Sequence, residues 1–415
     1  MRVLFTIAWR NIWRHTRRTL LTVGTVALGL MLLLLSVGLG DGGHYQMIDS
    51  AVRLGSGHVV IQAPGYQQSR GVAKLIDGGA QRRALAMLDT VHDRFAIRTV
   101  LRRVFASGLA ASAEDSAGVQ MIGIEPAREE AVSRFAEKLV EGRFLESDDS
   151  DDVVLGSGVA RRLALRPGDK LVLTVQEVGG AELQSMLVHV GGVMRTGMED
   201  FDESVLLLPL VTAQRFFRMG EGVHQVAMLI ADSRLAEPLA RLGREQLPGL
   251  DVLTWAQALP ELNDFIRVDD AGNYLFNTVF FVLIAFLVLN TLLMSVLERK
   301  REFALLDALG LTPDRRFSMI MLEAGFIALL SAAFGAALGL LGHLYFAVHG
   351  MPIDWFYSGE ISAAGVAFDP VIYSNLSGNR ILGCIGLVFL LTLLLALIPA
   401  RRAARPAEAY LLGRT

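Results

Sequence analysis

The sequence predicts a membrane α-helical protein with four transmembrane helices and a large extracytoplasmic α+β domain inserted between helices 1 and 2. The composition is the first reason, because 52% of the 415 residues are hydrophobic, 20% are charged and the mean hydropathy is +0.43. This is too apolar for an ordinary globular enzyme and too charged for spanning helices alone. The second reason is that four apolar runs approach the roughly 20 residues that cross a hydrocarbon core.

The four apolar runs divide the chain into segments. They predict transmembrane helices at 19–40, 273–297, 317–349 and 380–400. The third run is longer than a bilayer requires, so we expect it to tilt or to extend beyond the lipid. Residues 41–272 form a soluble region that is long enough to bury a core of its own. Residues 350–379 form a second loop on the same side of the membrane.

Positive charge predicts the orientation, because Lys and Arg near the ends of spanning helices stay on the cytoplasmic side. Basic residues flank the four runs at four places: Arg10, Arg14, Arg17 and Arg18; Arg299, Lys300 and Arg301; Arg315 and Arg316; and Arg401, Arg402 and Arg405. Both termini, including the tail 401–415, are therefore expected in the cytoplasm. The region 41–272 is expected outside.

The N-terminal residues 1–18 are interpreted as an amphipathic elbow helix on the inner leaflet, in contact with membrane lipids. One face carries apolar residues at helical spacing: Phe5, Ala8, Trp9, Ile12 and Trp13. A plain cytoplasmic extension of the first spanning helix is the alternative. A cleaved signal peptide is not favoured, because the apolar run is too long and 36–40 lacks a small-residue cleavage site.

The outer region alternates strand-like and helix-like segments. Strands are predicted at 58–62, 119–124, 171–175, 187–190 and 226–230, and helices at 80–95, 127–139, 211–219, 233–246 and 254–268. The only cysteine, Cys384, lies in the fourth apolar run, so the outer region contains no disulfide. An α+β domain without covalent cross-links is expected.

The sequence offers no catalytic machinery. It contains no Gly-x-x-x-x-Gly-Lys-Ser/Thr loop to hold nucleotide phosphates and no Gly-x-Ser-x-Gly elbow, and its eight histidines lack metal-ligand spacing. The acidic stretch 146–152 lacks the glycine and the final glutamate of a calcium loop. A net charge of −3 gives no reason to expect nucleic acid. We therefore expect no catalytic residue, no metal and no bound cofactor in this chain.

Polar and small residues in the third apolar run indicate helix packing. A charge in lipid costs on the order of 3 kcal/mol, so Glu323 is expected to face protein or water. Snorkelling, or an ion pair with a nearby arginine, would relieve this cost, and helix-to-helix bonding is favoured over a proton path. Ser331, Gly335, Gly339 and Gly342 recur at three and four residues. Such a stripe lets helix backbones approach closely. It fits packing within the chain or against a second subunit.

The segment 298–316, between the second and third runs, is predicted to be a cytoplasmic coupling helix and turn. Its charged and apolar residues are predicted to form a binding site for a soluble partner: Glu298, Arg299, Arg301, Glu302, Phe303, Leu305, Leu306, Leu309 and Gly310. Phe303 and Leu306 share one face, and Leu305 and Leu309 share another. Burial of these residues in lipid headgroups is the alternative.

Several of these segments resemble a known family. The residues 297–310 and 322–326, the glycines up to Gly342, and 398–409 look like the FtsX-type permease domain of ABC systems in the MacB class. The resemblance spans the chain, because one helix, a large outer domain and three more helices is that family's arrangement. The length and the residues 54–62 are most similar to the lipoprotein-releasing LolC/LolE branch.

The resemblance implies a non-catalytic permease subunit in a bacterial inner membrane. It implies a cytoplasmic ABC ATPase dimer that binds ATP and Mg²⁺, a second permease subunit that is a copy or a relative, and lipoprotein cargo passed to a periplasmic carrier. Cargo acyl chains would enter between the first and second helices, where Met31, Leu34, Phe276 and Phe280 are candidate lining residues. Export of peptides or amphiphiles, regulation of a periplasmic partner, and a membrane scaffold or sensor are the alternatives.

The sequence departs from the LolC pattern at one place. In LolC-like subunits a proline-containing hook recruits the lipoprotein carrier, whereas 175–183 is shorter and contains no proline. The resemblance therefore does not extend to carrier docking by this chain.

Overall fold

The computed structural model describes residues 2–14, 16–69, 71–130, 133, 135–176, 182–299, 302–303, 305, 310–352, 362–363, 366–367 and 371–404. The chain divides into two compact units. The membrane unit comprises Met1–Tyr45, Val268–Ser358 and Pro370–Thr415. The domain unit comprises Gln46–Arg267 and Gly359–Asp369.

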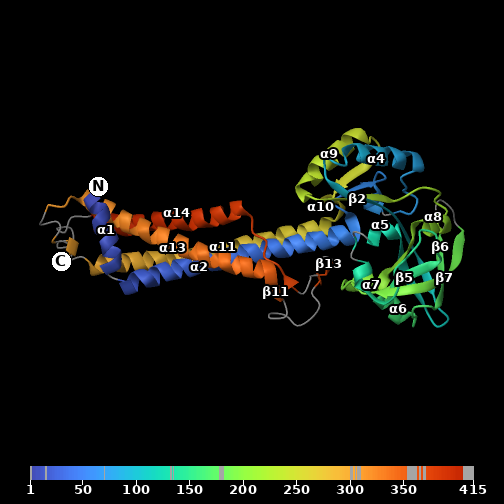
Figure 1. Cartoon of the computed structure of the whole chain (residues 1–415), viewed down its shortest axis with the longest axis horizontal. Coiled ribbons are helices and arrows are strands. Elements are labelled where there is room, and N and C mark those ends of the chain that lie inside the picture. Colours follow the sequence, from blue (N-terminus) through green and yellow to red (C-terminus); the bar gives the residue numbers. More distant parts are fainter. Residues whose placement is uncertain are drawn as a thin grey trace. The chain divides into compact units, whose positions relative to one another are not determined.

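In the described part of the chain, four helices are long and apolar enough to cross a membrane (Figure 1): α2 (Thr16–Ala51), α11 (Pro260–Glu298), α13 (Pro313–His349) and α14 (Gly378–Ala403). This confirms the predicted four-helix membrane portion. α2 and α11 continue well past their apolar runs, because hydropathy reports contact with lipid and not where a helix ends. The short helix α1 (Arg2–Arg14) packs on α13, where Trp9 and Phe5 contact the ring of Phe326 at centroid distances of 5.2 and 4.9 Å.

The small-residue stripe of α13 faces α2 of the same chain. A Cβ atom at Gly335 would lie 2.9 Å from the carbonyl oxygen of Ala27, and one at Gly339 would lie 2.6 Å from Leu34 Cδ1. Ser331 is fully buried, and a Cβ at Gly342 would lie 2.9 Å from Leu35. Only glycine allows these backbones to approach so closely.

The connection from α13 to α14 crosses α2. Strands β11 (Met351–Pro352) and β14 (Val371–Ile372) pair antiparallel, and the backbone N–H of Asn375 then donates to the carbonyl oxygen of Gly38 at 2.8 Å. Ser374 Oγ lies 2.8 Å from Nδ1 of His343. A second two-residue pair, β12 (Ser362–Ala363) with β13 (Val366–Ala367), belongs to the domain unit.

In the described residues, the domain unit is built on a ten-stranded sheet: β1 (Val59–Gln62), β2 (Ile97–Ala111), β3 (Ser116–Ile124), β4 (Leu139–Gly142), β5 (Asp152–Gly156), β6 (Lys170–Gln176), β7 (Leu183–Met194), β8 (Val205–Pro209), β9 (Gln225–Ile230) and β10 (Asp251–Thr254). Its helices are the π-helical η1 (Val52–Ser56), α3 (Tyr66–Ser69), α4 (Gly78–Val91), α5 (Pro126–Glu130), η2 (Ala136–Lys138), α6 (Ser157–Arg162), α7 (Glu199–Ser204), α8 (Leu210–Phe216), η3 (Ser233–Leu235), α9 (Ala236–Gln246) and α10 (Trp255–Ala258). The predicted α+β domain between the first two spanning helices is confirmed.

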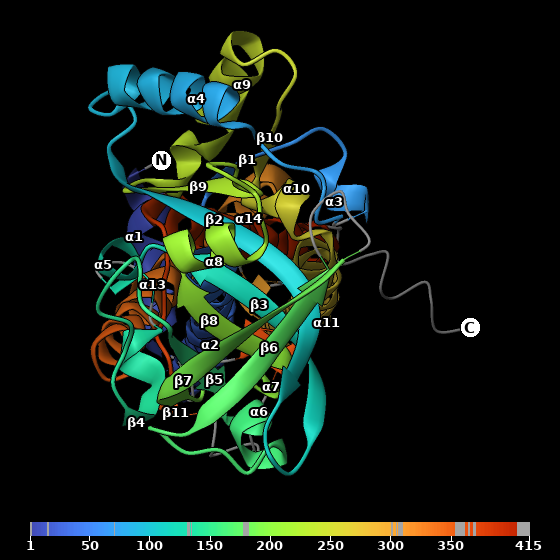
Figure 2. The same ribbon diagram turned by 90° about the vertical axis from the view of Figure 1, so that its right-hand side faces the viewer.

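The long strand β2 joins two halves of the domain. Its first half pairs with β9 in the order β10-β1-β9-β2, and α4 and α9 lie together beside this part (Figure 2). Its second half pairs with both β3 and β6, which closes a ring of pairings through β2, β3, β8, β5, β7 and β6. A closed ring leaves few unpaired edges within it.

All five predicted strands are present, but the helix predicted at 127–139 is wrong. Helix α5 ends at Glu130, η2 covers Ala136–Lys138 and β4 begins at Leu139. The cause is Phe135, which is buried in a small core with Ile124 and Val154 and so returns the chain to the sheet. The helix predicted at 254–268 is split at Leu259, because a residue before proline disfavours the helical region.

A buried ion pair fixes the π-helical segment η1 within the domain. Arg103 of β2 donates from Nε and Nη2 to the two carboxylate oxygens of Glu129 in α5, at 2.6 and 2.9 Å. Its Nη1 donates to the carbonyl oxygen of Gly55 in η1. The following Gly57 has φ +64°, and a Cβ there would lie 2.9 Å from the backbone of Met228. The chain that follows α2 is thus positioned both by the hydrogen bond to Gly55 and by the close packing at Gly57.

The buried histidine of the domain is held in one tautomer. The backbone N–H of Phe105 donates to Nδ1 of His224 at 2.9 Å, so Nε2 carries the proton and donates to the carbonyl oxygen of Val72 at 3.0 Å. Burial lowers the pKa of His224 from the usual 6.5 to about 4.

We expect His224 to make the domain unit sensitive to acid. A histidine whose pKa is lower in the folded state stabilises the fold fully above pH 6.5, and this stability is lost as the pH falls toward 4, where the unfolded chain binds the extra proton. Between pH 7 and pH 5 the loss amounts to roughly 2 kcal/mol. Pulse proteolysis of the full-length protein in urea, at pH 7 and pH 5, measures it.

His224→Gln should be less stable at pH 7 but should lose less stability on acidification. The control is His92→Gln, at an exposed position after α4, which should behave as the wild type. Equal pH dependence in the wild type and His224→Gln would show that this histidine is not the acid-sensitive group.

Candidate functional site: a buried arginine–glutamate junction

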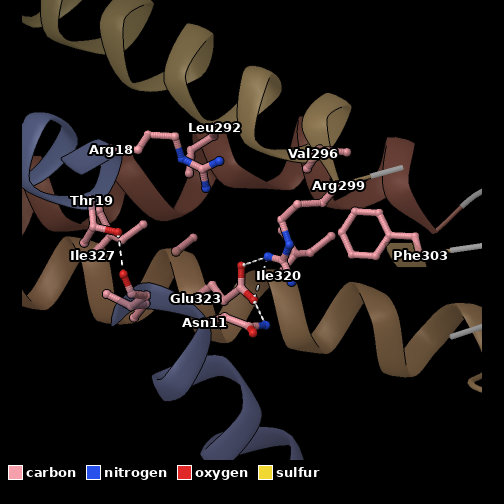
Figure 3. A pocket seen from close by; sticks show the side chains of 12 residues that line it. Asn11, Arg18, Thr19, Leu292, Val296, Arg299, Phe303, Ile320, Glu323 and Ile327 are labelled. Carbon is pink, nitrogen blue, oxygen red and sulfur yellow. Dashed lines mark hydrogen bonds and ion pairs between the residues drawn. The ribbon is translucent and has the colours of Figure 1, made fainter. Parts of the chain in front are cut away.

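A buried ion pair joins the start of the predicted coupling segment to the bundle (Figure 3). Arg299, just after α11, donates from Nη1 to both carboxylate oxygens of Glu323 in α13, at 3.0 and 2.8 Å. Asn11 of α1 donates to Glu323 Oε1 at 2.7 Å. Arg299 Nε donates to Glu302 at 2.9 Å. One carboxylate therefore connects three elements that are far apart in the sequence.

Burial makes this junction costly to break. The side chains of Arg299 and Glu323 are only 7% and 12% exposed. Removing one member of such a pair leaves an uncompensated charge away from water, which costs several kcal/mol, whereas intact hydrogen bonds offset the desolvation. Glu323 therefore makes the helix-to-helix bonds that the sequence favours, and of the two alternatives for relieving its charge the structure shows the ion pair with an arginine.

The apolar surroundings of the junction hold Phe303 inside the bundle. Phe303 is 5% exposed and packs with Val296, Met319 and Ile320. The guanidinium carbon of Arg299 lies 5.2 Å from the centroid of its ring, within cation–π range. α14 closes the cluster with Ala400 and Ala403.

A cavity of about 20 Å³ lies at the junction, with room for about one water molecule. Residues from α1, α2, α11 and α13 and from the coupling segment line it: Asn11, Ile12, Arg18, Thr19, Leu292, Val296, Arg299, Phe303, Ile320, Glu323, Ala324 and Ile327. Thr19 Oγ1 donates to the carbonyl oxygen of Ile12 at 2.8 Å, which ties α1 to α2. A cavity of this size suits a mechanical joint and not a substrate site.

Two further ion pairs lie at the edge of the junction. Arg18 contacts Glu298 at 3.1 Å and Arg14 contacts Glu302 at 3.5 Å. Their side chains are more exposed than those of the central pair, so each contributes little stability by itself. They add connections from α1 and α2 to the segment after α11.

The predicted coupling residues differ in how far the structure buries them. Arg301, Leu306 and Leu309 lie outside the described residues. Arg299 and Phe303 are turned into the protein's own bundle, so they do not offer a surface for a partner. Leu305, in contrast, is 66% exposed. The remaining candidates are intermediate or exposed, and Gly310 ends the segment with φ +86°, which a residue with a side chain rarely adopts.

The four candidate cargo-lining residues do not share one open surface. Leu34 is fully buried against Gly339 of α13, and Met31 is half-buried. Phe276 is 55% exposed and contacts the half-buried Phe280 at a centroid distance of 4.9 Å. Of the four, the structure brings together Phe276 and Phe280 on α11.

Sequence reasoning did not single out Asn11 or Arg18. Asn11 is a lone amide between apolar residues at positions 9 and 12 of α1, and an amide in such a place requires a hydrogen-bond partner when buried. The sequence therefore contained a signal that Asn11 would need a hydrogen-bond partner. Its partner could not be named, because the contact spans 312 positions of the sequence.

Two family models match the chain. Residues 19–242 match the MacB-like periplasmic core domain, and residues 274–407 match the FtsX-like permease C-terminal. The chain belongs to the MacB/FtsX family of ABC transporter permeases. Members of this family act with an ATPase and a permease partner, and the spanning helices with a MacB-like domain make this chain a multi-pass inner-membrane permease with a periplasmic domain.

Named relatives of this permease lie in the lipoprotein-releasing group. It is 24% identical to the lipoprotein-releasing system transmembrane protein LolC of Neisseria meningitidis serogroup B, over 78% of this chain and 80% of that one. It is 25% identical to LolE of Haemophilus influenzae, over 71% and 72%. The crystal structure of the periplasmic region of MacB from Actinobacillus actinomycetemcomitans covers 54% of this chain and 97% of that one, at 17% identity and a TM-score of 0.35.

We expect Glu323→Leu to destabilise this permease by roughly 3–5 kcal/mol, because Arg299 would remain buried without its partner. The double variant Arg299→Met/Glu323→Leu should recover most of the loss, because an apolar pair removes both charges. Thermal unfolding of the full-length protein in detergent provides the measurement.

The matched control is the more exposed pair, Arg18→Met/Glu298→Leu, where the expected change is about 1 kcal/mol or less. If Glu323→Leu proved as mild as this control, or if the double variant were no better than the single, the junction would not be the stabilising contact described.

Proposed function

We propose that this permease transmits ATP-driven motion from a cytoplasmic ATPase, through the coupling segment and the Arg299–Glu323 junction, to its periplasmic domain, and that this motion releases lipoproteins from the inner membrane. The single observation that carries the mechanical part is the buried junction, which connects the coupling segment to α1 and α13. ATP and Mg²⁺ bind to the partner ATPase, and this chain binds no cofactor.

The basic residues at the helix ends support a cytoplasmic location for the junction and for both termini. Leu305 supports the docking of an ATPase at the segment after α11, because it is a large apolar side chain that the permease itself leaves exposed. A few buried apolar anchors supply most of the binding energy of a protein interface.

The junction explains how a force on the segment reaches the membrane helices. Displacing Glu302 and Phe303 displaces Arg299, and Arg299 holds both oxygens of Glu323. Separating the pair costs more than moving α11 and α13 together, because both charges are buried. The helix ends therefore move as one body.

Continuity of the stalk helices supports transmission to the periplasmic domain. α2 passes from the membrane unit into the domain unit at Tyr45 and Gln46, and α11 does so at Arg267 and Val268. Each helix is unbroken across that boundary. An uninterrupted hydrogen-bonded helix transmits axial displacement with little loss.

Lipoprotein cargo is proposed from the two relatives named as lipoprotein-releasing proteins, together with a second permease subunit that is a copy or a relative. Phe276 and Phe280 remain candidate contacts for acyl chains. Carrier docking by this chain is not proposed, because 175–183 contains no proline and 177–181 lie outside the described residues.

We expect Leu305→Asp to reduce co-purification of the ATPase by roughly tenfold or more, because a charge would enter an apolar contact without a partner. Membrane insertion should be unchanged, since Leu305 is exposed in the permease. The control Leu305→Met keeps the apolar contact and should retain the ATPase. If Leu305→Asp co-purified with the ATPase as well as the wild type does, this segment would not be the ATPase-binding site. Phe303→Asp is unsuitable, because it would disrupt the bundle itself.

Depletion of this permease should cause lipoproteins to accumulate in the inner membrane and to decline in the outer membrane. Fractionation of the two membranes, followed by mass spectrometry of the lipoproteins, measures the change. An unchanged lipoprotein distribution, with the ATPase still bound, would instead favour export of peptides or amphiphiles, or regulation of a periplasmic partner.

A further inference from the structure

The end of the α2–α11 contact opposite to Arg18 and Glu298 carries a cluster of charged groups. His44 of α2 contacts two consecutive carboxylates of α11: its Nε2 lies 2.7 Å from Asp269 Oδ2, and its Nδ1 lies 3.5 Å from Asp270 Oδ1. Asn273 donates to Asp269 at 3.0 Å. These residues all belong to the membrane unit.

A cavity of about 60 Å³ lies within this cluster, between α2, α11 and the start of α14. Its lining is mostly polar: Ser36, Val37, Gly40, Asp41, His44, Asp270, Asn273, Tyr274, Asn277 and Arg380. Farther along the same two helices the contact is apolar, and a Cβ at Gly29 would lie 2.6 Å from Ile284. The two helices are thus joined by apolar packing in one half and by polar contacts in the other.

The cluster places a carboxylate oxygen beside each ring nitrogen of His44. Ionised carboxylates only accept hydrogen bonds, and a neutral imidazole has one N–H whereas the imidazolium has two. Both ring nitrogens of His44 face carboxylate oxygens. Among the described residues, the other charged or titratable groups around the cavity are Asp41, Arg380 and Tyr274, and Arg380 pairs with Asp41. The three carboxylates of Asp41, Asp269 and Asp270 thus lie near one permanent cation, Arg380. A proton on His44 reduces the excess of negative charge.

The cluster is also weak enough to open. The side chains of Asp269 and Asp270 are each 47% exposed, so water can replace their contacts at small cost, unlike those of the buried Glu323. At the opposite end, α2 contacts α11 through the partly exposed Arg18–Glu298 pair, and the buried Arg299–Glu323 pair additionally anchors that end of α11 to α13.

We propose that His44, Asp269 and Asp270 form a clasp that holds this end of α2 and α11 together when His44 is protonated, and that release of the clasp lets the two helices separate during the transport cycle. The second half of this statement rests on the proposed function. The clasp itself does not, because it is a property of the isolated permease.

Cross-linking tests the clasp in the full-length permease, in membranes and with Cys384 replaced by Ser. The outer cysteine pair is Ser36→Cys/Asn277→Cys, whose native side chains lie 3.4 Å apart. The reference pair is Arg18→Cys/Glu298→Cys, at the opposite end of the same two helices. A short bis-methanethiosulfonate reagent is applied at about pH 5.5 and about pH 8, on either side of the range in which histidine ordinarily titrates. The ratio of the two yields cancels the pH dependence of thiol reactivity.

The ratio of outer to reference cross-linking should fall several-fold between the lower and the higher pH. His44→Gln should abolish this dependence, and His44→Arg should keep the ratio high at both pH values. A ratio that does not change with pH in the wild-type background, or that changes equally in His44→Gln, overturns the clasp.

The link to transport is tested by locking the outer pair with the reagent and assaying lipoprotein release by the reconstituted complex. Release should stop in the locked protein and return on reduction with dithiothreitol. Normal release by the locked protein overturns the second half of the proposal while the clasp stands. Absence of release before locking is instead a failure of the proposed function.

Discussion

The membrane unit depends on satisfying one carboxylate in an otherwise apolar helix. Glu323 cannot face lipid at low cost, so it requires donors, and Arg299 and Asn11 are the donors that the fold supplies. Meeting this requirement fixes the position of α1 against α13, the rotation of α13, and the point at which the chain leaves α11. Phe303 then fills the apolar space beside the pair. The placement of Arg299 and Phe303 therefore depends on a buried charge and not on local helix propensity alone.

The two ends of the α2–α11 pair differ in the kind of contact that holds them. At the Arg299 end, the permanently charged pair Arg18–Glu298 joins α2 to α11, and Arg299 Nη1 donates to both oxygens of the buried Glu323, which anchors α11 to α13. At the His44 end the carboxylates are half exposed and the cation depends on a proton. Between the two ends, Gly29 of α2 leaves room for the side chain of Ile284 of α11, and the glycines of α13 lie against α2. This difference fits the proposed separation of α2 and α11 at the His44 end, where the cation depends on a proton.

The sequence predicted the spanning helices and the domain insertion, because apolar composition and strand content are local properties. The sequence could not predict which residues of the coupling segment are buried in the protein's own bundle and which are exposed to a partner. Arg299 and Phe303 have the pattern of a partner-binding helix, and the same pattern fits burial against the protein's own bundle, so only the position of Glu323 in space decides between them. The strand β2 was not predicted, because its buried positions are interrupted by arginines, and one of these, Arg103, is itself buried by pairing with Glu129. Long-range pairing overrides local pattern in both cases.

The two buried arginine–glutamate pairs occupy equivalent mechanical positions in their units. Arg299–Glu323 holds the chain as it leaves α11, and Arg103–Glu129 holds the π-helical segment that follows α2 through the carbonyl oxygen of Gly55. Stability alone does not explain them, since apolar pairs of similar volume often stabilise a fold at least as well. Apolar surfaces slide past one another, however, whereas a buried ion pair with several hydrogen bonds restricts both the rotation and the position of a helix end. Under the proposed function, displacement along α2 and α11 requires that constraint where each helix meets the rest of the protein.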